Sequence, residues 1–301
     1  MSTLQTSARP GVVRPGDPGG SAPPRRRIVA SPAAWLVWGA VVLFMLLLVG
    51  VVGSVLVNSF GTRWFGTWFP EGVTTQWYSQ AWQEFGLLQV VLVTLEVSAA
   101  VVVLSIVVGV PASYVLARRD FPGKRLVYLA FLLPILMPPI TYGIPLATVL
   151  YKFGLAGNAS GVILANLVPC VPFVILTMTP FIEQIDPTIE RAARMSGAGL
   201  WSLFTRILAP LLVPGILAAA ILVLVRTVGM FELTFLTAGP DSQTLVVALF
   251  NSMNAAGIRA QQSVDAMAVI YMTVMMILLV IALRFVNPTQ LVAQVKEEPE
   301  S

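Results

Sequence analysis

The sequence predicts an all-α membrane protein, a bundle of six transmembrane helices. Its 301 residues are 57% hydrophobic and 11% charged, whereas about a quarter of the residues of soluble domains are charged. Six apolar runs approach or exceed the roughly 20 residues that cross about 30 Å of hydrocarbon. The runs lack the period-two alternation of a membrane barrel, so we expect them to be helices.

The composition also argues against most catalytic chemistry. The chain has no histidine and one cysteine, Cys170, which excludes histidine-based triads, disulfides within the chain and thiolate metal clusters. We therefore expect no catalytic, cofactor-binding or metal site in this chain. The net charge of +4 is small and dispersed, unlike that of a nucleic-acid binder, whose basic residues cluster on one face.

The sequence predicts a tail at each end of the chain and six membrane spans between them. Residues 1–30 are rich in Pro, Gly, Ser and Arg and contain no apolar run, which predicts a disordered cytoplasmic tail and not a signal peptide. We expect residues 31–290 to form the six-span transmembrane domain and residues 291–301 to form a second cytoplasmic tail. The six spans are expected at about 35–57, 87–117, 126–150, 161–181, 211–236 and 264–286.

The basic residues predict the orientation of the bundle. With the N-terminus inside, the outside loops hold Arg63, Lys152 and Arg259, Arg226 lies within a span, and the remaining Lys and Arg residues fall inside. This is a strong positive-inside bias. Both termini are therefore predicted to be cytoplasmic.

The first outside loop, residues 58–86, is rich in aromatic side chains. Such a density of amphipathic rings is typical of the headgroup level of a bilayer or of a surface that docks another protein, and both interpretations stay open. The aromatic residues are Trp64, Trp68, Trp77, Tyr78 and Trp82.

The most informative segment is the inside loop 182–210. Asp186 followed by Pro187 predicts a helix start, and Gly197 predicts its end, so a helix of about ten residues lies between them. A helix this short cannot span a membrane. Charged residues lie beside the small pair Ala192-Ala193, which favours either a surface for a close protein contact or an ordinary connecting helix.

An interfacial helix is expected after Gly197. The prolines Pro210 and Pro214 would mark the point where this helix turns into the membrane. Its apolar residues recur at spacings of three and four: Trp201, Phe204, Leu208, Leu211 and Leu212.

This loop resembles the cytoplasmic signature of the permease subunits of binding-protein-dependent ABC importers. The resemblance rests on Glu190, Ala192, Ala193, Gly197, Ile207 and Pro210, which have the spacing of that signature. Arg191 stands where glutamate is usual, and Ala209 stands where leucine is usual. The resemblance covers roughly residues 87–286.

The resemblance implies the fold of a type I ABC importer permease in a bacterial cytoplasmic membrane. The short helix would dock on a nucleotide-binding ATPase subunit through the signature residues and Arg191. The other implied partners are a second permease chain and an extracytoplasmic substrate-binding protein. The chain has no glycine-rich loop of the form GxxxxGK[ST], so ATP and Mg would be bound by the ATPase partner.

Charged groups inside spans are costly and indicate function or a structural ion pair. The spans contain Glu96, Arg226 and Glu232, which we assign to the translocation pathway or its gate. Arg226 and Glu232 are six residues apart and lie on different helix faces, so Glu96 is the more plausible partner for Arg226.

The substrate is less clearly indicated. The segment FELTFLTAGPDSQTL resembles the region near the outer gate of permeases for polyamines, iron and phosphonates, with sugar permeases as the alternative. Two other classes stay open: a secondary transporter, which would need an inverted repeat, and an intramembrane enzyme, which would need a nucleophile with its base. Association with a nucleotide-binding subunit would separate the importer from both.

Overall fold

The computed structural model describes residues 32–62, 70–254 and 260–284, so the predicted tails 1–30 and 291–301 lie outside the described residues. The chain divides into two compact units, Met1–Gly50 and Val51–Ser301. The boundary lies inside α1 (Pro32–Phe60). This helix is apolar over most of its length and contains the candidate span Ala34–Phe60, as predicted from the first run.

The described residues contain five helices that could cross a membrane, or six if one bent pair counts as a span. This confirms the predicted helical bundle. The further spans are α3 (Leu87–Arg118), α6 (Ala159–Glu183), the continuous stretch Trp201–Val228 and α12 (Gln261–Arg284), and the bent pair is α4 (Lys124–Leu136) with α5 (Pro139–Lys152).

The third span, expected at about 126–150, is broken into two helices. The axes of α4 and α5 differ by 99°, and Met137 and Pro138 between them have extended backbones. The cause is local, because each of two consecutive prolines disfavours a helical conformation in the residue before it.

The fifth span also differs from the prediction of 211–236. It begins earlier, because α8 (Leu200–Leu203), the π-helical turn η1 (Phe204–Leu208) and α9 (Ala209–Val228) run on without a turn. The predicted turn at Pro210 and Pro214 is therefore wrong. The π-helical turn lies directly before Pro210, inside the continuous helical stretch. The span ends at Val228, and α10 (Glu232–Thr237) is a separate helix.

Two helices that were not predicted lie in the predicted outside loops, α2 (Gln76–Glu84) and α11 (Leu245–Asn254). In α2, Trp77 Nε1 donates a hydrogen bond of 2.8 Å to the Gly61 carbonyl, and the Tyr78 and Ser59 hydroxyls are 2.8 Å apart. These two aromatic residues thus stabilise the fold itself. Trp64 and Trp68 lie outside the described residues.

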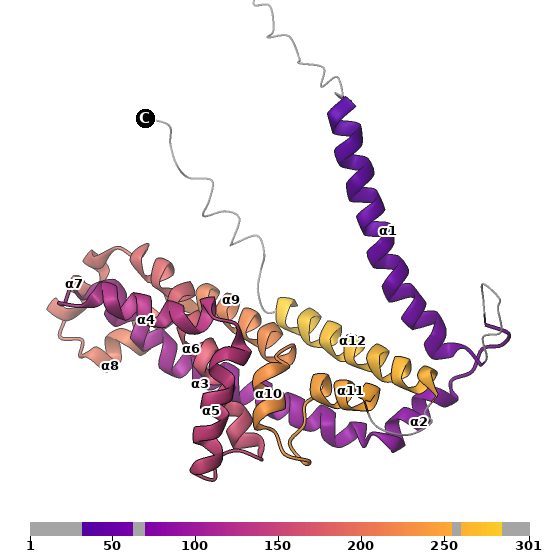
Figure 1. Cartoon of the computed structure of the whole chain (residues 1–301). Coiled ribbons are helices and arrows are strands. Elements are labelled where there is room, and N and C mark those ends of the chain that lie inside the picture. The colour runs from indigo at the N-terminus through magenta and orange to yellow at the C-terminus, as the bar shows by residue number, and fades with distance from the viewer. Residues whose placement is uncertain (1–31, 63–69, 255–259, 285–301) are drawn as a thin grey trace, which may run out of the picture. The chain divides into compact units, whose positions relative to one another are not determined.

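The core of the second unit lies where α3, α6 and α9 pack together. Gly109 on α3 permits this close approach, because a Cβ atom there would lie 2.7 Å from Val174 Cγ1 on α6. Figure 1 shows α7 (Pro187–Met195) and α8 at one end of this unit, and α2 and α11 at the other. The predicted inside loop 182–210 and the outside segments that contain α2 and α11 thus lie at opposite ends of this unit.

Candidate functional site

The helix α7 begins as the sequence predicts. The Asp186 side chain accepts a hydrogen bond of 2.8 Å from the Thr188 main-chain N–H, and Pro187 is the first helical residue. This hydrogen bond stabilises the carboxylate form and lowers the pKa of Asp186 below its usual value. The capped start defines where the inside loop becomes helical.

The end of α7 is equally well defined. Gly197 has a φ of +83°, a left-handed conformation that glycine adopts without the strain of a side chain. The Ala198 N–H donates to the Ala193 carbonyl and the Gly197 N–H to the Arg194 carbonyl, each at 3.0 Å. This pair of hydrogen bonds is a Schellman motif, and it confirms the predicted stop at Gly197.

Glu190 is expected on a surface that docks the ATPase subunit, but in the structure it lies against α3. Its side chain is buried, and its carboxylate accepts hydrogen bonds of 2.7 Å from the Tyr114 hydroxyl and from Arg118 Nε on α3. Arg118 also donates from Nη2 to the Ile185 carbonyl at 2.6 Å. Glu190 therefore fixes α7 to the C-terminal end of α3, with each of its carboxylate oxygens hydrogen-bonded within the chain.

The two alanines of the signature face different ways. Ala192 is exposed, whereas Ala193 is half-buried and packs against the core cluster. Arg191 and Pro210 are exposed, and Ile207 is half-buried against the same core cluster. The outward part of the predicted coupling surface is thus centred on Arg191 and Ala192.

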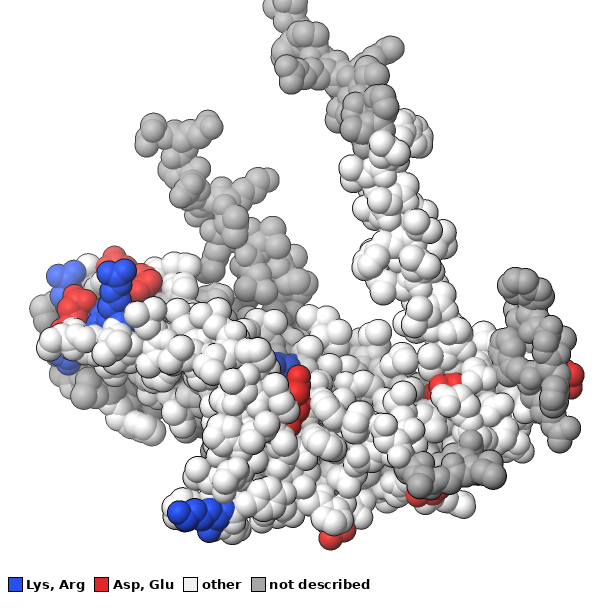
Figure 2. All heavy atoms as spheres, viewed as in Figure 1, with Lys and Arg blue, Asp and Glu red and all other residues white. Residues whose placement is uncertain are grey.

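Charged side chains gather around this helix. Figure 2 shows basic and acidic atoms together at the end of the unit where Figure 1 places α7, whereas most of the visible face between the two ends is uncharged. This separation is typical of a protein whose middle is surrounded by lipid and whose ends are in water. It places α7 at a water-exposed end of the bundle.

The expected bridge between Glu96 and Arg226 is absent. The ion pairs among the described residues are Arg118 with Glu190 at 2.7 Å and Lys124 with Asp120 at 3.1 Å. Glu96 lies on an exposed face of α3, while the Arg226 guanidinium carbon is 5.8 Å from the Phe173 ring centroid on α6. The prediction of this bridge is therefore wrong, because the two side chains leave their helices in different directions.

The structure instead packs α5, which carries Tyr142, against α10, which begins at Glu232. Within the described residues, the Tyr142 hydroxyl and Arg226 Nε are buried without a hydrogen-bond partner. Sequence reasoning missed Tyr142, since its position depends on the sharp bend before α5. Arg226 and Glu232 belong to two different helices, because α9 ends at Val228 and α10 begins at Glu232. Their spacing of six residues therefore does not show on which faces they lie.

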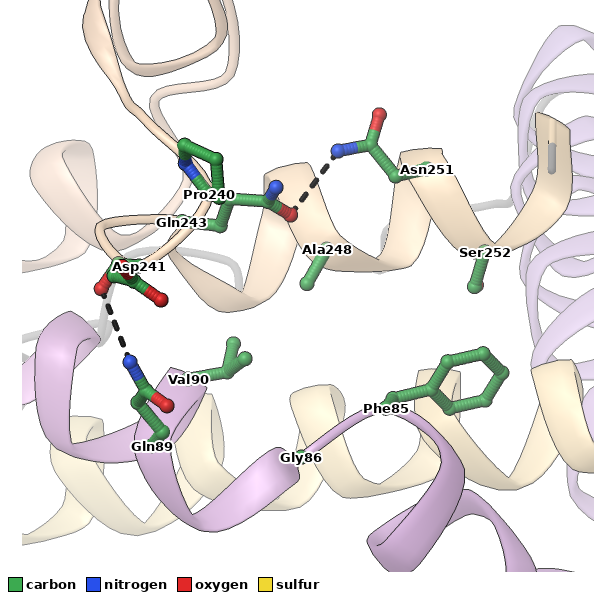
Figure 3. A pocket seen from close by; sticks show the side chains of 10 residues that line it. All are labelled: Phe85, Gly86, Gln89, Val90, Pro240, Asp241, Gln243, Ala248, Asn251 and Ser252. Atoms are coloured by element: carbon green, nitrogen blue, oxygen red, sulfur yellow. Dashed lines mark hydrogen bonds between the residues drawn. The ribbon is translucent and has the colours of Figure 1, made fainter. Parts of the chain in front are cut away.

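A pocket of about 280 Å³ lies at the opposite end of the unit. Its polar lining comes from three segments, the start of α3, the loop before α11 and α11 itself (Figure 3). Gln89 Nε2 donates to the Asp241 carbonyl at 3.4 Å, and Asn251 Nδ2 donates to Gln243 Oε1 at 3.1 Å. Pro240, Asp241 and Gln243 belong to the segment that indicated an outer gate.

Comparison with known proteins gives a family match over more than half of the chain. Residues 105–291 match the model described as "Binding-protein-dependent transport system inner membrane component". The matched range includes α7 and the predicted signature.

Three relatives illustrate the range of similarity. The diacetylchitobiose uptake system permease protein of Streptomyces coelicolor is 29% identical over 201 residues, which are 65% of this chain and 65% of that protein. The molybdenum transport system permease protein of Escherichia coli is 30% identical over 56% of this chain and 81% of its own length. The trehalose transport system permease protein of Mycobacterium tuberculosis is 36% identical over 50% and 55%.

Solved structures show the same fold. A bacterial ABC transporter involved in the import of the acidic polysaccharide alginate contains a chain that superposes with a TM-score of 0.66 and 18% identity, covering 89% of this chain and 99% of that one. A second structure, of the alginate transporter in complex with its pentasaccharide-bound periplasmic protein, gives a TM-score of 0.60 at 15% identity.

Proposed function

The chain belongs to the family of inner membrane components of binding-protein-dependent transport systems, and from this premise we propose that it forms half of the translocation pathway of an ATP-driven importer. It is a multi-pass membrane permease of the ABC importer family. In the proposed assembly a separate nucleotide-binding subunit hydrolyses ATP, and closure of the two ATPase subunits moves the membrane helices.

One observation supports this proposal most: α7 is a short helix with a defined start and end. It is attached to α3 on one side, and its other side is exposed. Its nine residues are too few to span a membrane. Glu190 holds it to α3, and Ala192 points outward beside Arg191. A small outward side chain lets a partner surface approach closely. A rigid connection to α3 would pass the partner's movement to a membrane-spanning helix.

The test is a bulky substitution on the outer face. We expect Ala192→Trp to insert into the membrane at normal levels while losing the nucleotide-binding subunit or its substrate-stimulated ATP hydrolysis. The reason is that a tryptophan would separate two packed surfaces. The matched control is Lys152→Trp, an exposed position at the far end of α5. Full ATPase coupling in Ala192→Trp would contradict the proposed role of α7.

We assign the translocation pathway to Arg226, Glu232 and Tyr142, with the exposed Glu96 facing a second permease chain or the pathway itself. Unpaired charges are tolerated in a membrane where water or a polar solute reaches them. Arg226→Gln should therefore lower the transport rate without releasing the ATPase subunit. Equal losses of transport and of assembly would indicate a structural role instead.

The remaining proposed partners are a second permease chain and an extracytoplasmic binding protein, in a bacterial cytoplasmic membrane. The pocket around Asp241 and Asn251 is the proposed contact with the binding protein, because α11, which lines it, lies at the end opposite α7 (Figure 1).

For the substrate, the relatives described above are named for sugars and for molybdenum. These names give no support to the expectation of a polyamine or iron. We propose a sugar or an oxyanion. Thermal shifts of the binding protein against trehalose, diacetylchitobiose, molybdate, sulfate and spermidine would decide, and a shift with spermidine alone would contradict the proposal.

A further inference from the structure

A cavity of about 230 Å³ lies between α7 and the C-terminal end of α3. Four arginines line it, Arg118 and Arg119 from α3 and its end, and Arg191 and Arg194 from α7. Glu190 and Arg191 lie three and four residues after Pro187, and Arg194 lies four and three residues after them, so one side of α7 faces this cavity.

The acidic groups at the cavity do not balance these four charges. Glu190 is the carboxylate in the lining, and Arg118 and Tyr114 already occupy it at 2.7 Å each. Asp186 interacts electrostatically with Arg118 and Arg191, but it caps α7 through its hydrogen bond with Thr188. The cavity therefore keeps a net positive charge.

The remaining guanidinium groups have spare donors. Within the described residues, Arg119 and Arg191 are exposed and make no hydrogen bond to another side chain, and Arg194 makes a single long contact of 3.5 Å with the Tyr114 hydroxyl. A guanidinium group presents its donors in a planar fork that matches a carboxylate. Three such groups around one cavity are suited to bind an anion.

The neighbouring surface indicates where this anion comes from. Arg191 precedes Ala192, the residue on which the proposed ATPase contact is centred, so a subunit seated on Ala192 also covers Arg191. Covering an unpaired cation is costly unless the partner supplies the opposite charge. Ile189 and Met195 of α7 are also exposed, at 41% and 84%, which adds apolar contact area beside the charged cavity.

We infer that the arginine cavity formed by Arg119, Arg191 and Arg194 receives an acidic side chain of the nucleotide-binding subunit. This inference rests on the proposed docking of α7. In this arrangement Glu190 positions the helix from within the chain, and the charged contact with the ATPase has the opposite sign: the permease contributes the cations and the ATPase contributes the carboxylate.

The test is charge reversal in the assembled transporter, reconstituted in nanodiscs. Arg191→Glu and Arg119→Glu should each raise the dissociation constant of the nucleotide-binding subunit about tenfold or more at low salt, because repulsion replaces attraction. The matched control is Arg125→Glu, an exposed arginine at the start of α4 outside the cavity. Reversing the contacting Asp or Glu of the ATPase to Arg should restore binding to Arg191→Glu.

Three outcomes would overturn the inference. Binding of the ATPase subunit by Arg191→Glu at the level of Arg125→Glu would show that the cavity is not a contact. An effect that occurs in phosphatidylglycerol nanodiscs and vanishes in phosphatidylcholine would assign the anion to lipid headgroups. A lowered melting temperature of the isolated Arg191→Glu chain would show a structural role.

The same assay separates this inference from the function on which it rests. If Ala192→Trp retains the ATPase, the proposed docking of α7 fails. If Ala192→Trp releases the ATPase while Arg191→Glu binds normally, docking stands and the charged contact fails.

Discussion

Glu190 shows how one residue can belong to a functional signature and yet act inside the chain. Its sequence position predicts a contact with another subunit, but its side chain is 8% exposed and has Tyr114 and Arg118 as partners. The sequence could not reveal this, because Arg118 is 72 positions away. The signature thus combines an anchor, Glu190, with outward residues such as Arg191 and Ala192.

The anchor predicts strong coupling between its two charged residues. Glu190→Gln and Arg118→Gln should each destabilise the folded subunit by about 3 kcal/mol, because each change leaves a largely buried charge without its partner. The double substitution should cost much less than the sum of the two. Thermal unfolding of the purified subunit and its three variants measures this, and additive losses would contradict the anchor.

The cap of α7 predicts a dependence on pH. The pKa of Asp186 is lowered by the hydrogen bond from the Thr188 N–H, so its contribution to α7 is complete above the usual value of 3.8 and is lost as the pH falls through the lower value of the folded protein. As the pH falls below 3.8, amide hydrogen exchange in α7 should therefore become faster relative to exchange in α6. Asp186→Asn should abolish this added acceleration, and an unchanged profile in that variant would contradict the cap.

At the scale of the helices, the sequence predicts starts and stops well and interruptions poorly. Asp186, Pro187 and Gly197 act as predicted because caps depend on a few adjacent residues. The effect of a proline depends on its place in the hydrogen-bond pattern. Pro139 follows a break between two helices, whereas Pro210 lies in an unbroken span after a π-helical turn.

The left-handed conformation of Gly197 predicts a selective effect of adding one methyl group. Gly197→Ala should destabilise the end of α7 by roughly 1 kcal/mol, because an alanine is strained at positive φ although its Cβ would meet open space. Gly199→Ala is the matched control, since its Cβ also meets nothing and its φ lies outside the positive range. Equal melting temperatures of the two variants would argue against the Schellman motif.

For the molecule as a whole, composition and hydropathy were sufficient to predict a helical bundle, and the signature was sufficient to predict the family. The sequence did not allow contacts between side chains on distant helices to be predicted. The Glu96–Arg226 bridge failed for this reason, and the packing of α5, with its buried Tyr142 hydroxyl, against α10 was missed. Periodicity gives the face of one helix but not which helix lies against it.

The orientation of the bundle remains a prediction from its charges. The helices α7 and α11 lie at opposite ends of the second unit (Figure 1), so one accessibility measurement at each end fixes the orientation. The chain is well suited to thiol labelling, because its single cysteine, Cys170, is buried in α6 and can be replaced by serine to give a background without thiols.

The most direct test of the account is therefore a cross-link from Ala192→Cys in a Cys170→Ser chain within the assembled transporter. We predict that this cysteine reacts with the nucleotide-binding subunit and is labelled from the cytoplasmic side, whereas Lys152→Cys reacts from the outside and never with the ATPase. Labelling of position 192 from the outside, or a cross-link from Lys152→Cys to the ATPase, would contradict the assignment of α7 as the helix that couples ATP hydrolysis to transport.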